Sequence, residues 1–385
     1  MTSMTSTPQR TAEIAGAGLA GLAAATALAK RGWRVRVHEK GKELREIGAG
    51  IYLWQNALHA LRGLGVYDKV EESGVRSTVP RLLQDHKGRE INLRRNGYGD
   101  PELIVILRTE LHRILAEEAA ASGVDIVTNS RVMGADPEGR LEFESGMGPK
   151  VDLVVGADGV FSKVRDSTKL ARRIVGLRDG CGRHLIPRKD GDGLNSRRIE
   201  MWNGGRRIGM APANKDYHYV FLCCPEEDVA GRIQQPFNLE AWVQSHPMYE
   251  EYLRRLPRHP EEHWRPFFNV HCSHWSKGRV CIVGDAAHGM APNLGQGACV
   301  AIVNATVLAK TVSETNDILD GLQRWERAER PYIDQTQRMS YLYGFVGTRW
   351  PSKLLGLRSR ILPIISRTDT FQRNLRCAVD HLPSI

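Results

Sequence analysis

A glycine-rich turn between two short strands is the feature that most constrains how this chain folds. Residues 16–21 read Gly-Ala-Gly-Leu-Ala-Gly, after the apolar-leaning run 11–15 and before the Ala- and Leu-rich stretch 22–30. An alternating strand follows at residues 33–39. Strand, turn, helix and strand with GxGxxG spacing predict a βαβ unit that binds a dinucleotide. Gly16 permits the turn, Gly18 lets the backbone approach a pyrophosphate, and Gly21 lets the helix pack on the strand.

An acidic residue supports this prediction. Glu39 closes the second strand, where an acid accepts hydrogen bonds from a ribose hydroxyl, and it favours an adenosine ribose without a 2′-phosphate. Glycine-rich turns are common in proteins, so the flanking strands and this acid are needed for the argument. The motif alone does not separate FAD from NAD.

Two later segments repeat the theme of an apolar strand followed by a Gly/Asp turn. Residues 151–159 end in Asp158-Gly159, and residues 278–288 contain Gly284-Asp285. After the second segment come Pro292 and the run Gly295–Ala298, which opens a long Ala/Val-rich helix. Either segment alone fits any α/β protein. Their joint occurrence after GxGxxG indicates a more specific architecture.

With these three motifs, residues 12–334 resemble the class A flavoprotein aromatic hydroxylases, the p-hydroxybenzoate hydroxylase-like superfamily. The resemblance implies FAD as cofactor, with Asp285 at the ribityl chain and Asp158 near the pyrophosphate. It places the helix N-terminus at residues 295–298 against the flavin pyrimidine ring. Arg108 matches an arginine that contacts FAD in many relatives. The implied FAD-binding residues are Gly16, Gly18, Leu19, Ala20, Gly21, Glu39, Lys40, Arg45, Arg108, Asp158, Gly284, Asp285, Gly295, Gln296, Gly297 and Ala298.

The sequence has no second GxGxxG unit for a nicotinamide cofactor. This fits the family, in which NADH or NADPH binds transiently as a co-substrate without a domain of its own. The family's chemistry implies hydroxylation of an electron-rich ring through a C4a-hydroperoxyflavin, with O2 as the other substrate.

The segment between the two later motifs is typical of antiparallel sheet. Residues 198–202 alternate, Asn203-Gly204-Gly205 supplies a turn, residues 206–210 return, and 217–222 form another strand. We therefore expect an α/β fold: a Rossmann-like FAD-binding domain of the GR2 type, an inserted antiparallel-sheet substrate domain and a C-terminal helical tail. The expected boundaries are 1–75, 101–175 and 276–345 for the FAD domain, 76–100 and 176–275 for the substrate domain, and 346–385 for the tail.

Within the superfamily the chain most resembles the branch of 2-methyl-3-hydroxypyridine-5-carboxylic acid oxygenase. This implies a substrate pocket in which Tyr52, Arg207 and Tyr219 are catalytic, and Arg183 and Pro292 also bind the substrate. Arginines can hold a carboxylate bidentately, and tyrosine hydroxyls can orient a ring oxygen or a water. Taken singly, each such residue is as often surface charge or packing as function.

Two departures from that branch bear on the substrate. Ala291 replaces a cysteine, and Pro80 replaces a tyrosine. We expect a hydroxypyridine carboxylate, of the methylated or the 5-hydroxynicotinate type, with ring cleavage after hydroxylation. A 6-hydroxynicotinate or salicylate type of hydroxylation, simple or decarboxylative, stays open.

Composition excludes several other classes. The 385 residues carry a net charge of +10, but their Arg and Lys residues are dispersed and match no nucleic-acid-binding module. The excess charge suits a pyrophosphate and a small anionic aromatic substrate. Seven scattered cysteines form no CxxC pair, which predicts no metal site and a cytoplasmic location.

No apolar run is long enough for a membrane span, and prolines at 351 and 363 interrupt the basic, apolar tail. We expect the tail to dock on the body or on a dimer partner, with no stable membrane association. His288 and His38 are expected to be structural. The rival functions are another flavin chemistry, such as halogenation or alkene reduction, and a non-catalytic FAD- or nucleic-acid-binding regulator.

Overall fold

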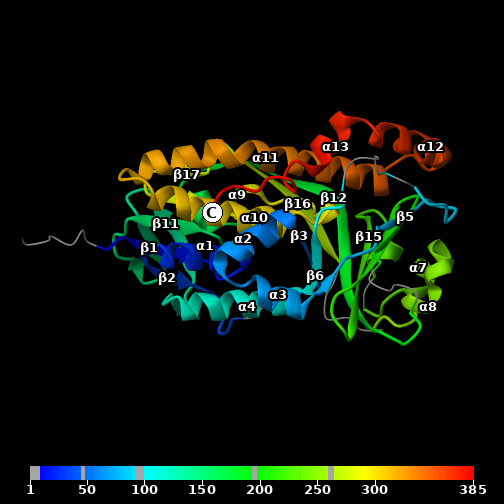
Figure 1. Ribbon diagram of the computed structural model, residues 1–385, viewed down its shortest axis with the longest axis horizontal. Helices are drawn as coiled ribbons and strands as arrows, with labels where there is room; N and C mark the ends of the chain where they lie inside the picture. Colours follow the sequence, from blue (N-terminus) through cyan, green and yellow to red (C-terminus); the bar gives the residue numbers. More distant parts are fainter. Residues whose placement is uncertain are drawn as a thin grey trace, which may run out of the picture.

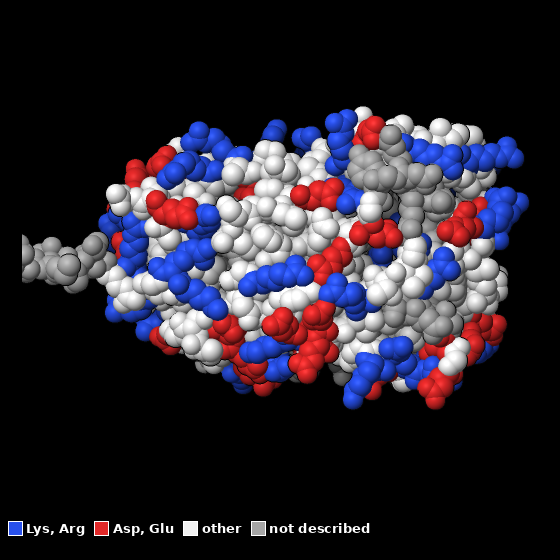
Figure 2. Space-filling view, viewed as in Figure 1, with Lys and Arg blue, Asp and Glu red and all other residues white. Residues whose placement is uncertain are grey.

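The computed structural model describes residues 9–44, 48–91, 93, 99–192, 197–233, 235–258 and 264–385. Two large sheets lie at opposite ends of an elongated molecule, and long helices run along its sides (Figure 1). Lys and Arg side chains are mixed with Asp and Glu on the face shown in Figure 2, as the dispersed charges of the sequence suggest.

The first sheet has the strand order β17-β18-β11-β1-β2-β7. All its pairings are parallel except that of β17 with β18. Its strands are β1 (Thr11–Ala15), β2 (Arg34–His38), β7 (Asp125–Val127), β11 (Leu153–Gly156), β17 (Ser276–Lys277) and β18 (Val280–Ile282). Helices α1 (Leu19–Ala29), α4 (Arg108–Ala121) and α10 (Gly297–Ser313) pack together around α1. The predicted Rossmann-like domain is confirmed.

The second sheet, which we call the substrate sheet, has the order β16-β12-β15-β14-β13-β5. Its strands are β5 (Leu82–Gln84), β12 (Ala171–Pro187), β13 (Ile199–Asn203), β14 (Arg206–Pro212), β15 (Tyr217–Pro225) and β16 (Arg265–Cys272). The short helices α6 (Val229–Arg232), α7 (Leu239–Ser245), η1 (Pro247–Tyr249) and α8 (Glu250–Leu253) follow β15 in sequence. Trp242 of α7 and Leu253 of α8 pack with Ile208 and Val220 into a core on one face of the sheet. The face of the sheet away from α7 and α8 is not part of this core.

The substrate sheet differs from the expected one in two respects. The edge strand β5 pairs with β13 in parallel, whereas every other pairing is antiparallel. Strand β12 is 17 residues long, so the domain boundary that we expected at residues 175 and 176 falls inside one strand. Its pairing with β16 shifts register between Gly176 and Gly180, as at a β-bulge.

Two small sheets accompany the large ones. Strands β3 (Gly50–Trp54), β6 (Leu103–Leu107) and β4 (Val75–Arg76) form one small sheet. Strands β8 (Val132–Asp136), β9 (Arg140–Phe143) and β10 (Gly146–Met147) form another. The helices α2 (Gln55–Leu64), α3 (Tyr67–Ser73), α5 (Lys163–Ser167), α9 (Asp285–His288) and η2 (Pro292–Leu294) lie between the strands in sequence.

The C-terminal part is helical, as predicted. Helix α11 (Ile318–Thr348) contains Pro331, and η3 (Ser352–Leu354), α12 (Leu355–Ser366) and α13 (Asp369–Arg376) follow it. We expected both prolines to interrupt the tail. Pro351 does separate α11 from η3, but Pro363 lies inside α12 and does not end it. Among the described residues, no helix is both long and apolar enough to cross a membrane.

Candidate active site

The three Gly-containing motifs of the sequence meet in space. A Cβ added to Gly16, whose φ is +100°, would lie 2.5 Å from the carbonyl oxygen of Ala157, which precedes Asp158. A Cβ added to Gly284, at φ +60°, would lie 2.8 Å from the Cβ of Ala20. The first turn is therefore in contact with both later motifs, and only glycine fits at these positions.

The N-terminus of α1 has the features of an anion-binding helix end. Gly18 is its N-cap, no side chain caps it, and its first turn has no acidic residue. A Cβ on Gly21 would lie 2.0 Å from the carbonyl oxygen of Gly16, so the turn is packed tightly against the helix. Leu19 is buried and Ala20 partly exposed. Free N–H groups and the positive end of the helix dipole suit a pyrophosphate here.

Two carboxylates lie beside this turn. Glu39 accepts hydrogen bonds from the backbone N–H groups of Ala17 (3.1 Å) and Gly41 (2.8 Å). These bonds hold the side chain at the end of β2, where the sequence places the ribose. Asp158 accepts through Oδ2 from the N–H of Lys163 (2.7 Å), while its buried Oδ1 has no hydrogen-bond partner among the described residues. The structure thus adds a helix-capping role for Asp158 that the sequence did not reveal.

The second helix N-terminus lies where the sequence places the flavin ring. Gly295 is left-handed (φ +64°), and Gln296 is the N-cap of α10 without a side-chain cap. Gln296 is buried, and its Nε2 has no hydrogen-bond partner among the described residues. Gly297 and Ala298, the first residues of α10, are partly exposed. A buried amide and free helix N–H groups suit a polar ring edge.

The remaining expected cofactor residues surround these turns. Asp285 is exposed although the residues on either side of it are buried, so it faces outward from the turn. Arg108 begins α4, and its N–H donates to the carbonyl of Ala49 (2.9 Å). Lys40 is exposed, and Arg45 lies outside the described residues. These glycine turns, uncapped helix ends and buried polar atoms without partners fit bound FAD.

The predicted substrate residues share one face of the substrate sheet. Side chains directly opposite each other on paired strands point to the same face. Tyr219 on β15 is opposite Leu185 and Ala211, and Arg183 on β12 is opposite Phe221. The arginine Arg207 on β14 is opposite Cys223, two residues along from Phe221. Arg183, Arg207 and Tyr219 therefore all point away from the core formed with α7 and α8.

Tyr52 approaches this face from β3. Its ring meets that of Tyr219 edge to face, with centroids 6.2 Å apart. A Cβ on Gly295 would lie 2.9 Å from the ring of Tyr52, and one on Gly50 would lie 2.5 Å from the ring of Tyr219. Burial raises the pKa of Tyr52 to about 12, so its hydroxyl stays protonated at neutral pH. The two tyrosines thus lie where the turn before α10, which contains Gly295, meets the substrate sheet.

Arg207 is held in place but keeps donors free. It is 2% exposed, and its Nη2 donates to Asn293 Oδ1 and to Cys223 Sγ. Its Nε and Nη1 have no hydrogen-bond partner among the described residues, although Nη1 lies 3.6 Å from Glu200 Oε1. A buried guanidinium with free donors favours an anionic ligand, because an unsatisfied buried charge is costly.

Several neighbours of Arg207 were missed at the level of sequence. Glu200, on β13, accepts from Arg81 Nη1 (2.9 Å), Tyr343 OH (2.9 Å) and Trp202 Nε1 (2.7 Å). Asn293 donates to the carbonyl of Ser340 (2.9 Å) and so ties η2 to α11. Glu200 falls in the predicted strand 198–202, and the charge alternation there, Arg-x-Glu, was the available signal. Nothing in the local sequence marks Arg81 or Asn293.

The wall near the expected ring position is apolar. Ala291 packs with Cys181, Cys223 and Phe267 in one small cluster, beside the partly exposed Pro292. Pro80, the other departure, precedes β5 and accepts a hydrogen bond from Arg197 Nε at its carbonyl (3.2 Å). The first substitution therefore lies next to substrate-facing side chains, whereas the second lies at the sheet edge.

The two histidines expected to be structural are buried in packing contacts. His288 contacts the ring of Trp275 (centroids 5.4 Å apart), and burial lowers its pKa to about 4. His38 contacts Ser130 Oγ at 2.9 Å. Among the described residues, no cluster of His, Cys, Asp or Glu could hold a metal ion.

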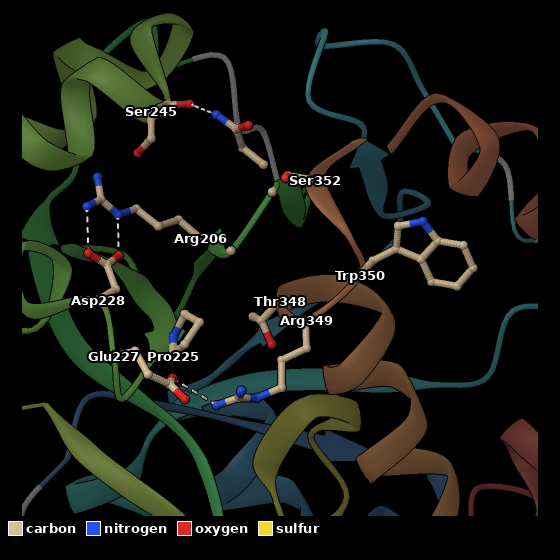
Figure 3. Close-up of a pocket in the computed structure, with 12 residues that line it drawn as sticks. Arg206, Pro225, Glu227, Asp228, Ser245, Thr348, Arg349, Trp350 and Ser352 are labelled. Carbon is tan, nitrogen blue, oxygen red and sulfur yellow. Dashed lines mark hydrogen bonds and ion pairs between the residues drawn. The ribbon is translucent and has the colours of Figure 1, made fainter. Parts of the chain in front are cut away.

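A surface pocket of about 660 Å³ lies elsewhere, between the β13–β14 turn and the end of α11 (Figure 3). Its arginines are already engaged: Arg206 pairs with both oxygens of Asp228, and Arg349 pairs with Glu227 and Asp179. Because these charges are neutralised within the protein, this pocket is a poor match for an anionic substrate.

Comparison with known proteins decides the family. The FAD binding domain family matches residues 10–317. The chain belongs to the class A FAD-dependent aromatic hydroxylases. Over 97% of both chains, the structure resembles the tetrameric form of 2-methyl-3-hydroxypyridine-5-carboxylic acid oxygenase, with a TM-score of 0.83 and 36% identity. The protein is therefore a flavin-dependent aromatic monooxygenase with FAD as cofactor and NAD(P)H as the family's co-substrate.

Curated relatives point to more than one kind of ring. The 2-heptyl-3-hydroxy-4(1H)-quinolone synthase of Mycobacteroides abscessus is 34% identical over 344 residues, 88% of this chain and 90% of the relative. The 3-hydroxybenzoate 6-hydroxylase 1 of Aquipseudomonas alcaligenes is 30% identical over 391 residues, 93% and 95% of the two chains. The family of this monooxygenase is thus known, whereas its substrate has to be argued from the site.

Proposed function

We propose that this monooxygenase hydroxylates a hydroxypyridine carboxylate and that ring cleavage follows. The observation that carries the proposal is Arg207, a buried guanidinium on the substrate face with two nitrogen donors free of hydrogen bonds among the described residues. A planar carboxylate satisfies two such donors at once. The likeness to 2-methyl-3-hydroxypyridine-5-carboxylic acid oxygenase supports the same class of substrate.

Each of the other predicted residues has a role in this proposal. Arg183 adds positive charge on β12, which β15 separates from the strand of Arg207. Tyr52 and Tyr219 orient the ring oxygen, and their protonated hydroxyls act as hydrogen-bond donors because burial raises both pKa values. Pro292 forms the wall between the ring and the loop that leads into α10.

The cofactor is held by the turns described above. In the proposal the N-terminus of α1 faces the pyrophosphate, Glu39 the adenosine ribose, and Asp285 the ribityl chain. The chemistry that FAD supplies when bound is oxidation of NAD(P)H and activation of O2.

The protein's own contribution is placement and exclusion of water. Phe221, Leu185 and Ala211 surround Tyr219 with apolar surface. A dry pocket strengthens the hydrogen bonds and charges that fix the ring. In the proposal the substrate is held at two points: Arg207 binds its carboxylate, and the tyrosines bind its ring oxygen. These two contacts fix the position of the ring carbon to be hydroxylated.

A second candidate is hydroxylation of an alkylquinolone, by analogy with the relative from Mycobacteroides abscessus. The apolar cluster of Cys181, Cys223, Phe267 and Ala291 favours it, since an alkyl chain needs apolar surface. The buried guanidinium of Arg207 counts against it, because a neutral quinolone has no carboxylate to accept from Nε and Nη1, which have no hydrogen-bond partner among the described residues. Simple or decarboxylative hydroxylation of a 6-hydroxynicotinate or salicylate type of substrate remains compatible with the same arginine.

Mass spectrometry separates these possibilities. The FAD-loaded enzyme is given NADH or NADPH, ¹⁸O2, and in turn 5-hydroxynicotinate, 2-methyl-3-hydroxypyridine-5-carboxylate, 6-hydroxynicotinate, salicylate and 2-heptyl-4(1H)-quinolone. We expect ¹⁸O in an acyclic product from one of the first two substrates. Labelled product from the quinolone alone would overturn the proposal, as would substrate-independent oxidation of NAD(P)H with all five compounds.

Three further predictions from the sequence stand as proposals. We propose the division into a discontinuous FAD domain, a substrate domain and a C-terminal segment, which the two large sheets support. We also propose a cytoplasmic location and a homo-oligomer. The structural relative named above occurs in a tetrameric form, which supports self-association, and the dimer considered for the tail is one such assembly.

A further inference from the structure

Arg198 points to the same face of the substrate sheet as Glu200. It lies directly before β13, two residues from Glu200, and alternation along a strand sends both side chains to one side. The adjacent strand β5 runs parallel to β13, with Ile199 paired to Leu82, so Arg81 and Arg198 are neighbours. Neither arginine was among the residues expected from the sequence.

The guanidinium of Arg198 lies over two aromatic rings. Its central carbon is 5.7 Å from the centroid of Tyr52 and 5.2 Å from that of Trp54. Its Nε donates to Ser77 Oγ (3.2 Å), and its other two nitrogens have no hydrogen bond among the described residues. Two cation–π contacts and one hydrogen bond restrain the guanidinium and leave its other two nitrogens for a ligand.

The charges around Tyr52 do not balance. The charges of Arg81, Arg198 and Arg207 all lower the pKa of its hydroxyl, and the charge of Glu200 raises it. Arg81 is paired with Glu200, which also lies near Arg207. The exposed Asp100 also acts electrostatically on Arg198, and its charge raises the pKa of that guanidinium. Among the described residues, this region therefore carries more positive than negative charge, in partly desolvated surroundings.

This excess is costly without an anion. Burial lowers the pKa of Arg198 to about 10, and the neighbouring Arg81 acts in the same direction. An arginine that is desolvated, stacked and short of hydrogen bonds is stabilised when an anion reaches its free edge. Arg207 meets the same condition more deeply in the site, so two separate anionic groups would be accommodated.

We propose that Arg198 binds the ionised ring oxygen of the substrate, while Arg207 binds its carboxylate. This inference rests on the proposed function and deepens it, because it assigns the substrate a doubly anionic form. Arg198 is the group for the ring oxygen because it stacks on Tyr52, the side chain proposed to orient that oxygen. The hydroxyl proton leaves to solvent when the ligand binds, and the resulting negative charge makes the ring more electron-rich.

The test compares two ligands on the oxidised FAD-loaded enzyme, without turnover. Nicotinate carries the carboxylate alone, and 5-hydroxynicotinate carries both groups. Dissociation constants come from the change in flavin absorbance, and ionisation of the bound hydroxyl comes from the ligand's own absorption as pH is varied. We expect Arg198→Gln to weaken 5-hydroxynicotinate about tenfold to a hundredfold, to leave nicotinate within about twofold, and to raise the pKa of the bound hydroxyl.

Three variants make the result specific. Arg198→Lys keeps the charge but loses the planar stacking, and should recover part of the affinity. Arg197→Gln removes the same charge one residue away, where the side chain bonds the Pro80 carbonyl, and should change neither constant. Arg207→Met should weaken both ligands. FAD content and thermal unfolding confirm that each variant is folded.

The outcomes are distinguishable. Equal weakening of both ligands by Arg198→Gln, or no weakening of either, would overturn the ring-oxygen site while leaving the proposed function intact. An unchanged pKa of the bound hydroxyl would overturn it as well. If the wild-type enzyme binds neither ligand, the proposed function fails together with the site.

Discussion

Arg207 donates a hydrogen bond from Nη2 to Oδ1 of Asn293, and this bond joins the substrate sheet to the turn before α10. Asn293 in turn donates to the carbonyl of Ser340 on α11. Gly295, two residues further along the chain, packs against Tyr52. Through this hydrogen bond, Arg207 links a bound ligand to the loop that carries the expected flavin contacts.

The first prediction places a competing carboxylate at this junction. Asn293→Asp would pair with Arg207 inside the protein, so the substrate carboxylate should bind about tenfold to a hundredfold more weakly. Titration of the oxidised enzyme with 5-hydroxynicotinate measures this. Asn214→Asp is the matched control: its Oδ1 accepts from the N–H groups of Asp216 and Tyr217 in a turn, and the aspartate can do the same. Equal affinities of Asn293→Asp and wild type would contradict the assignment of Arg207.

A second prediction removes the guanidinium. Arg207→Met should raise the KM for the aromatic substrate by about tenfold to a hundredfold, because a charge-assisted pair is lost. The enzyme should still bind FAD, since Arg207 is not among the expected FAD-binding residues. Steady-state kinetics with NADH or NADPH in excess measure the effect. A KM within twofold of wild type would remove Arg207 from the site.

A third prediction concerns the pyrophosphate turn. In Gly21→Ala the new methyl would lie 2.0 Å from the carbonyl oxygen of Gly16, so the turn has to move. We expect loss of bound FAD and a drop of about 1–3 kcal/mol in the free energy of unfolding. The ratio of absorbance at the flavin band to that of the protein reports FAD content. Gly356→Ala, in α12 with nothing within 4 Å, should retain FAD and gain about 0.5–1 kcal/mol.

A fourth prediction links stability to pH through His288. Burial lowers its pKa from 6.5 to about 4, so between these values the unfolded chain binds a proton that the folded protein excludes. The contribution of His288 to the free energy of unfolding is therefore fully present above pH 6.5. It is lost as the pH falls toward 4, by about 1.4 kcal/mol per pH unit. Denaturant unfolding of His288→Gln should show a shallower pH dependence in that window. His246, whose pKa burial lowers to about 3, accounts for part of the remaining slope. Parallel profiles for variant and wild type would contradict the prediction.

The parts of the site that the sequence revealed are those written in short contiguous motifs. The run 16–21 specifies its own turn and helix start, so β1, α1 and β2 could be predicted closely. Arg207 and Tyr219 fall in strands with regular alternation, which places them on one face once the hairpin is recognised. Whether they are close to Tyr52 could not be derived from alternation, and that placement came from the resemblance to the family.

The parts that were missed depend on contacts distant in sequence. Glu200 meets Arg81 across 119 residues and Tyr343 across 143. The parallel pairing of β5 with β13 brings Arg81 to the site, and a three-residue edge strand gives no local signal of its partner. Asn293 appears in sequence as an ordinary loop residue, and only the fold shows that it links η2 to α11.

The alternation along the strands of the substrate sheet has a consequence for how such an enzyme diversifies. Positions such as 183, 207 and 219 lie on the proposed substrate face, while Ile208, Val220 and Leu222 on the other face form the hydrophobic core. Selection can therefore exchange every second side chain and retune chemical preference without loosening the scaffold or disturbing the distant nucleotide turns. Two relatives at 34% and 30% identity are named for a quinolone and for a hydroxybenzoate. A sheet that separates substrate-facing from core side chains is compatible with such a range of substrates.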